Sequence, residues 1–126
     1  MFRYVNQKEG VQLIRKTDQK VVRQNAHGGK GHIEVYQILS PEELLNRATL
    51  YARVVLPPGA GIGGHPHAGE SESYYILSGT GVFLDGDGQK KPVGSGIICN
   101  IIPGESHGLE NTGDVPLEMI ALVVPQ

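Results

Sequence analysis

The fold is indicated most clearly by residues 59–79, Gly-Ala-Gly-Ile-Gly-Gly-His-Pro-His-Ala-Gly-Glu-Ser-Glu-Ser-Tyr-Tyr-Ile-Leu-Ser-Gly. Its two histidines, His65 and His67, are separated by one residue, and Glu72 follows five positions later. Side chains two residues apart on a strand point to the same side, so both imidazoles can face one ion. A third imidazole, His107, follows forty positions after His67 in a chain with five histidines. Three imidazoles and one carboxylate are a suitable ligand set for one divalent transition metal.

Around this stretch, short apolar runs alternate with turn residues. The chain has 126 residues, with 18 glycines and 8 prolines, which is typical of a single domain with many strands and tight turns. The run Asp85-Gly86-Asp87-Gly88 predicts a hairpin turn, because Gly and Asp tolerate positive φ. Short strands without helices between them indicate an antiparallel, all-β sandwich or barrel. From Pro57 onward the expected strands are 62–67, 72–77, 81–85, 96–101, 107–110 and 117–124, and residues 32–39 alternate as a half-buried strand should.

One short helix is expected near residues 41–47. Ser40 can cap its first turn, and Glu43 lies three residues beyond the cap, where it can bond back to the Ser40 backbone. Nothing on this helix indicates chemistry. We therefore expect two parts: residues 1–48 form an N-terminal arm with strands, and residues 49–126 form the β-barrel.

The bulk properties argue against several classes of partner and location. The formal net charge is −2 and no block of like charge occurs, so neither nucleic acid nor an anionic membrane is an expected partner. The N-terminal residues lack the apolar core of a signal peptide, and no apolar run is long enough to span a membrane. Cys99 is the one cysteine, which rules out an intrachain disulfide. We expect a cytoplasmic protein.

Two parts of the chain resemble the two motifs of the cupin superfamily. Residues 59–79 match the first motif, G-x5-H-x-H-x4-E-x6-G, at every fixed position. Residues 96–111 match the second motif, G-x5-P-x-G-x2-H-x3-N, except that Ile102 occupies the proline position. The 16 residues between the motifs are similar in number to those of small single-domain bacterial cupins of the type-2, oxalate-decarboxylase-like group.

The resemblance implies a jelly-roll β-barrel, also called a double-stranded β-helix, with a metal held inside by His65, His67, Glu72 and His107. It implies one divalent ion of Mn, Fe, Ni, Zn or Cu, and the residues do not decide among these. Glu70 competes with Glu72 as the carboxylate ligand, and the motif spacing favours Glu72.

Two functions are compatible with such a site. The first is an enzyme, a metal-dependent decarboxylase, dioxygenase or isomerase that acts on a small oxygen-rich carboxylate or sugar chelated to the metal. Glu70 and Tyr74 are the candidates for catalytic groups, and neither has a supporting motif. The second is a non-catalytic, metal-loaded module that binds a small molecule or sugar, since a fold does not determine activity.

The N-terminal arm has no place in the two motifs. His27 and His32 lie in this arm and are expected to be loop or surface residues. The arm could fold over the mouth of the barrel or pack on a second subunit. The family resemblance implies a homodimer, and the arm supports this expectation because such arms often cover exposed sheet edges of a partner.

Overall fold

The computed structural model describes residues 13–66 and 68–126, which contain ten strands and one short 3-10 helix, η1 (Ala26–Gly28). The strands are β1 (Val21–Gln24), β2 (His32–Gln37), β3 (Leu50–Leu56), β4 (Gly61–Pro66), β5 (Glu70–Ser78), β6 (Thr80–Leu84), β7 (Lys90–Gly94), β8 (Ile98–Ile101), β9 (Ser106–Glu110) and β10 (Leu117–Pro125).

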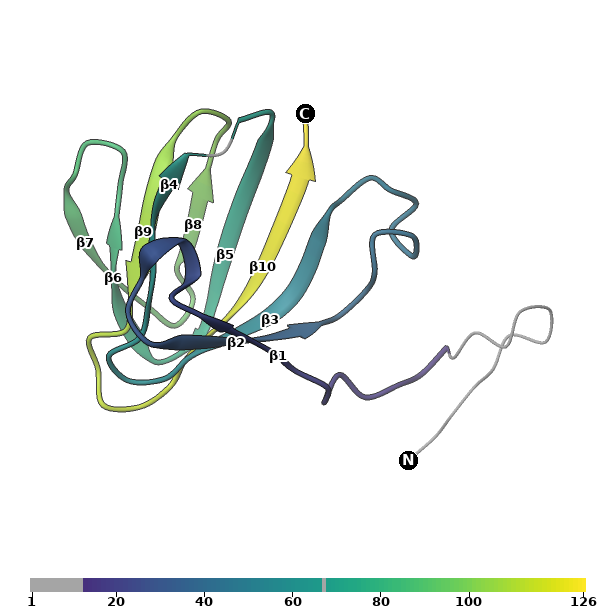
Figure 1. The fold of residues 1–126 in the computed structure, drawn as a ribbon, viewed down its shortest axis with the longest axis horizontal. Helices are drawn as coiled ribbons and strands as arrows, with labels where there is room; N and C mark the ends of the chain where they lie inside the picture. The colour runs from purple at the N-terminus through teal and green to yellow at the C-terminus, as the bar shows by residue number, and fades with distance from the viewer. Residues whose placement is uncertain (1–12, 67) are drawn as a thin grey trace.

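The strands form two antiparallel sheets. The six-stranded sheet has the order β1-β2-β3-β10-β5-β8, and the four-stranded sheet has the order β4-β9-β6-β7. Figure 1 shows the four-stranded sheet on the left and β3, β5 and β10 of the six-stranded sheet on the right. This arrangement confirms the predicted all-β, jelly-roll fold.

The hydrophobic core lies between the two sheets. On β10, Leu117, Met119 and Ala121 are buried, and the residues between them are half-buried. Leu109 and Ile62, from the four-stranded sheet, belong to the same buried cluster. Because alternate residues of a strand point to opposite faces, this pattern gives each sheet one apolar face that packs against the other.

The predicted hairpin turn joins β6 to β7. Asp85 N–H donates to the carbonyl of Gln89 (3.0 Å), and the Asp85 carboxylate accepts from Asp87 N–H at 3.0 Å. Strand β7 was not expected, because its sequence Lys-Lys-Pro-Val-Gly lacks regular apolar alternation. It is an edge strand, where Pro92 and exposed lysines are tolerated because one side needs no partner.

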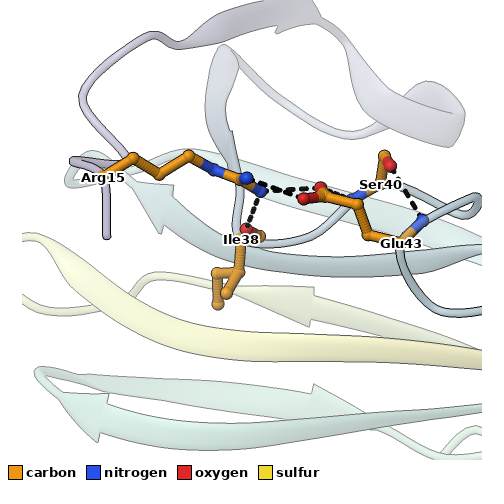
Figure 2. Close-up of polar contacts among 4 residues, drawn as sticks. All are labelled: Arg15, Ile38, Ser40 and Glu43. Atoms are coloured by element: carbon orange, nitrogen blue, oxygen red, sulfur yellow. Dashed lines mark hydrogen bonds and ion pairs between the residues drawn. The ribbon is translucent and has the colours of Figure 1, made fainter. Parts of the chain in front are cut away.

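The helix expected at residues 41–47 is absent, and turns occupy this segment. The predicted capping bonds do form: Glu43 N–H donates to Ser40 Oγ (3.2 Å), and Ser40 N–H donates to Glu43 Oε1 (2.9 Å), as Figure 2 shows. The helix cannot continue because Leu45 and Asn46 adopt left-handed φ angles of 57° and 56°. The capping box therefore forms, but the left-handed residues that follow it prevent a helix.

The same carboxylate joins two segments of the N-terminal arm. The guanidinium of Arg15 donates to both oxygens of Glu43, each at 2.6 Å, and to the carbonyl of Ile38 at 3.1 Å (Figure 2). Hydrogen bonding from Arg15 and from the Ser40 backbone lowers the pKa of Glu43 to about 2. A bidentate pair of this kind fixes the direction of both side chains.

Part of the arm belongs to the six-stranded sheet. Strand β2 pairs with β3 through contacts such as Val35 with Val54, and β1 pairs with β2. The division into an arm and a separate barrel stays a prediction. In the described part of the chain, no helix has the length and hydropathy needed to span a bilayer.

Candidate metal centre

Three candidate ligands converge from three strands. His65 on β4 is the direct register partner of His107 on β9, which places both imidazoles in the four-stranded sheet. Glu72 lies on β5, in the other sheet, and reaches them across the interior. One donor atom from each of the three side chains lies within 4.8 Å of the others. His67, the fourth predicted ligand, lies outside the described residues.

Two of these groups are buried and contact one another. Glu72 is 7% exposed and His107 is 2% exposed, and Glu72 Oε1 lies 3.1 Å from His107 Nε2. The hydroxyl of Tyr74 donates to Glu72 Oε1 (3.1 Å) and lies 3.1 Å from His107 Nε2. Burial of a carboxylate is costly unless partners compensate it, so these contacts stabilise a charge that the core alone would exclude.

The Tyr74 side chain belongs to this polar group rather than to the apolar core around it. Burial and the neighbouring Glu72 carboxylate raise the pKa of Tyr74 well above its usual range. The tyrosine therefore keeps its proton over the physiological pH range and acts as a hydrogen-bond donor.

The third candidate ligand, His65, is half-buried and bonded to its own strand. Its Nδ1 lies 3.0 Å from the carbonyl oxygen of Gly63. A carbonyl oxygen only accepts hydrogen bonds, so Nδ1 carries the proton and the lone pair of Nε2 is the ligand atom that the ring offers. A backbone carbonyl on the second nitrogen is the usual partner of a metal-binding histidine.

The donor set fits a divalent transition metal. Metal–nitrogen and metal–oxygen bonds of about 2.0–2.2 Å place two ligand atoms about 3 Å apart when they bind at right angles. The 3.1 Å between Glu72 Oε1 and His107 Nε2 agrees with that spacing. Two imidazoles with a carboxylate suit several first-row metals, so this group could hold an ion whose identity the chemistry leaves open.

A cavity of about 300 Å³ opens on this group. Its polar lining is Arg23, His27, Thr49, His65, Glu72 and Tyr74, and the other lining residues are mostly apolar side chains of β2, β3, β4 and β10. Arg23 is the one cation among these lining residues. A wider groove of about 790 Å³ lies beside the arm, but none of the three candidate ligands lines it, so the smaller cavity is the candidate ligand site.

Other predicted residues lie in different places. Tyr74 is in the centre of the group, whereas Glu70 is a half-buried residue at the start of β5 and is not one of the three converging ligands. Sequence reasoning missed Arg23 and His27 as lining residues, because both precede the two motifs. The sequence contains only a weak indication of this role: the two histidines outside the motifs, His27 and His32, both lie in the arm.

Comparison with known proteins gives the family. The family model for the Cupin domain matches residues 52–124, and the chain belongs to this family. It is 43% identical to an oxalate-binding protein of Thermotoga maritima over 119 residues, which is 93% of this chain and 98% of that protein. It is 28% identical to a mannose-1-phosphate guanylyltransferase of Escherichia coli, covering 90% of this chain and 24% of that enzyme.

Solved structures agree with the fold. A predicted oxalate decarboxylase from Thermotoga maritima superimposes with a TM-score of 0.86 at 41% identity, over 90% of this chain and all of that chain. A sugar phosphate isomerase of the cupin superfamily from Silicibacter pomeroyi has a TM-score of 0.69 at 19% identity, over 88% and 74% of the two chains. The second likeness shows a shared fold alone.

Proposed function

We propose that this protein binds a small carboxylate, such as oxalate, on a divalent transition metal inside the barrel. The observation that carries the proposal is the convergence of His65, Glu72 and His107. Two of them, His65 and Glu72, line a cavity whose one lining cation is Arg23. The similarity to an oxalate-binding protein over nearly the whole chain supports oxalate as the first ligand to test.

His65, Glu72 and His107 would hold the ion, with His67 as the fourth ligand expected from the sequence. When bound, the ion supplies a Lewis-acidic centre for carboxylate oxygens. The side chain of Tyr74 orients Glu72 and His107 through its hydroxyl. These contacts fix the two metal-binding side chains before a metal ion or a carboxylate binds. Less conformational entropy is therefore lost on binding.

Arg23 supports a carboxylate over a neutral sugar as the ligand. It lies on β1 opposite Ile33, and register partners share one face of a sheet. Ile33 is buried in the core, so Arg23 points to the inner face of the sheet, toward the cavity. Arg23 is an exposed residue of β1, and its guanidinium can form paired hydrogen bonds with a carboxylate at the mouth of the cavity.

Calorimetric titration of the Mn²⁺-loaded protein tests this proposal. We expect saturable binding of oxalate with one site per chain, weaker binding of oxamate, and no binding of glucose. Arg23→Gln should weaken oxalate binding about tenfold or more, because hydrogen bonds to charged groups contribute about 1.5–3 kcal/mol. Lys90→Gln on β7 removes the same charge away from the cavity and should bind oxalate like the wild type. No oxalate or oxamate binding by the metal-loaded wild type would refute the proposal.

A decarboxylase is the second candidate, and the Tyr74 hydroxyl is the observation in its favour. Conversion of hydrogen oxalate to formate and CO2 breaks the carbon–carbon bond and moves one proton from oxygen to the remaining carbon. The Tyr74 hydroxyl is a proton-bearing group in direct contact with two candidate ligands. Release of CO2 by the wild type and its loss in Tyr74→Phe, with oxalate still bound, would support an enzyme. Oxalate binding without CO2 release would contradict the decarboxylase and support a non-catalytic binding module.

A further inference from the structure

We propose that His27, on the N-terminal arm, is a positioning residue that holds the ring of His65 in its metal-binding orientation. The inference rests on the metal site of the proposed function. It extends the proposed metal site to a segment that precedes both cupin motifs, the loop around η1. Figure 1 shows this loop, in dark blue, crossing in front of β4 and β9.

The two imidazoles stack face to face. Their ring centroids are 3.5 Å apart and their planes differ by 7°. A nitrogen lone pair lies in the plane of its own ring, so two stacked rings cannot direct lone pairs at the same ion. His27 is therefore not a further ligand in this arrangement. It covers one face of His65 and blocks rotation of that ring toward the arm.

Strand β4 alone does not hold the His65 ring firmly. The pairing of β4 with β9 is irregular between Ile62 and His65, and two glycines, Gly63 and Gly64, precede the histidine. Glycines provide no side chains to pack against the imidazole. The bond from Nδ1 to the Gly63 carbonyl fixes one edge of the ring, and the stack with His27 fixes its face.

The loop that carries His27 is seated on β4 through close backbone contact. A methyl group on Gly63 would overlap the carbonyl oxygen of His27, and one on Gly29 would overlap the carbonyl oxygen of Gly61. Gly61 N–H also donates to the carbonyl of Lys30 at 2.9 Å. Glycine at these positions allows the arm to approach the strand closely enough for the two rings to stack.

The backbone of the loop is held in an uncommon conformation. Asn25 and His27 adopt left-handed φ angles of 51° and 49°. The Asn25 side chain braces this turn by donating to the Gly29 carbonyl at 3.1 Å. Glycine would suit the backbone better at position 27, so the histidine there costs energy that a side-chain contact must offset. The stack with His65 is that contact.

Titration with Co²⁺ tests the positioning role on the metal alone. We expect His27→Ala to weaken Co²⁺ binding about tenfold or more, as loss of a residue that orients a ligand commonly does. It should also shift the visible absorption bands of the bound ion, which a general loss of stability would not do. His27→Phe keeps a flat ring on His65 and should restore affinity to within about threefold of the wild type.

Two further variants complete the design. Gly63→Ala displaces the loop and should weaken Co²⁺ binding like His27→Ala. The matched control is His32→Ala, which removes a histidine of the same arm that lies near Glu34 and does not line the cavity. It should bind Co²⁺ like the wild type.

Each outcome decides the inference. If the wild type binds Co²⁺ and His27→Ala binds it equally well with the same spectrum, the positioning role is wrong and the metal site stands. Failure of His27→Phe to restore affinity would also contradict it, since stacking would not be the cause. If the wild type binds no Co²⁺, the metal site and this inference both fail. If Co²⁺ binds as expected but oxalate does not, the ligand assignment alone fails.

Discussion

Replacement of Asn111 by alanine should destabilise the fold strongly without touching the candidate ligands. Asn111 is the last fixed residue of the second motif and is 2% exposed. Its side-chain amide donates to the carbonyls of Leu56 and Val115, both at 2.8 Å, and its side-chain oxygen accepts from Gly113 N–H at 2.9 Å. The bond to Leu56 joins the end of β3 to the loop between β9 and β10, and the other two bonds lie within that loop.

The size of the effect follows from those three bonds. Each contributes about 1 kcal/mol to stability, and alanine leaves their backbone partners without the amide, so the expected loss is about 3 kcal/mol. The entropy of unfolding is about 2.1 cal/mol/K per residue, or roughly 0.26 kcal/mol/K for a chain of this length. The melting temperature should therefore fall by about 10 °C.

Thermal unfolding of metal-free protein, followed by circular dichroism, measures this shift. Asn100→Ala is the control, because Asn100 is an exposed residue of β8 and its loss should change stability by no more than about 0.5 kcal/mol. A melting temperature for Asn111→Ala within about 2 °C of the control would refute the reasoning, since three bonds to a buried amide would then contribute almost nothing.

Two other predictions concern the arm and the assembly. The carboxyl of Glu43 should titrate near pH 2 in the folded protein; because its pKa is lowered, the pair with Arg15 is complete above about pH 4.5 and is lost as the pH falls toward 2. An NMR titration of the Glu43 side chain would show this, and a midpoint above 4 would contradict the bidentate contact. We also propose a homodimer, so sedimentation velocity should give twice the chain mass of 13.5 kDa. A single species at 13.5 kDa would exclude it.

The sequence was sufficient for the fold class, and it named three candidate ligands that the structure brings together. Spacing alone predicted that His65 and His67 face the same side of one strand. The approach of Glu72 and His107 to His65 required the family resemblance, since strand periodicity does not say which strands and sheets face each other. The structure brings His65, Glu72 and His107 together.

Other features depend on tertiary contacts that leave little trace in local sequence. The capping pattern at Ser40 was correct, yet the helix does not form because Leu45 turns the backbone to the left-handed region. The position of His27 depends on glycines more than thirty residues later in the chain, and no local pattern connects the two segments. Arg23 is an exposed residue, and its place beside the cavity follows from its register opposite Ile33, which the sequence does not give.

The central claim is that His65, Glu72 and His107 hold one divalent metal. Its most direct test is the metal content of purified protein after equilibrium dialysis against Mn²⁺, measured by plasma mass spectrometry. We expect one Mn²⁺ per wild-type chain and less than about 0.1 per chain in His107→Ala, because the His107 imidazole lies 3.1 Å from Glu72 in the candidate site. A wild type without bound metal, or an alanine variant that keeps one ion per chain, would contradict it.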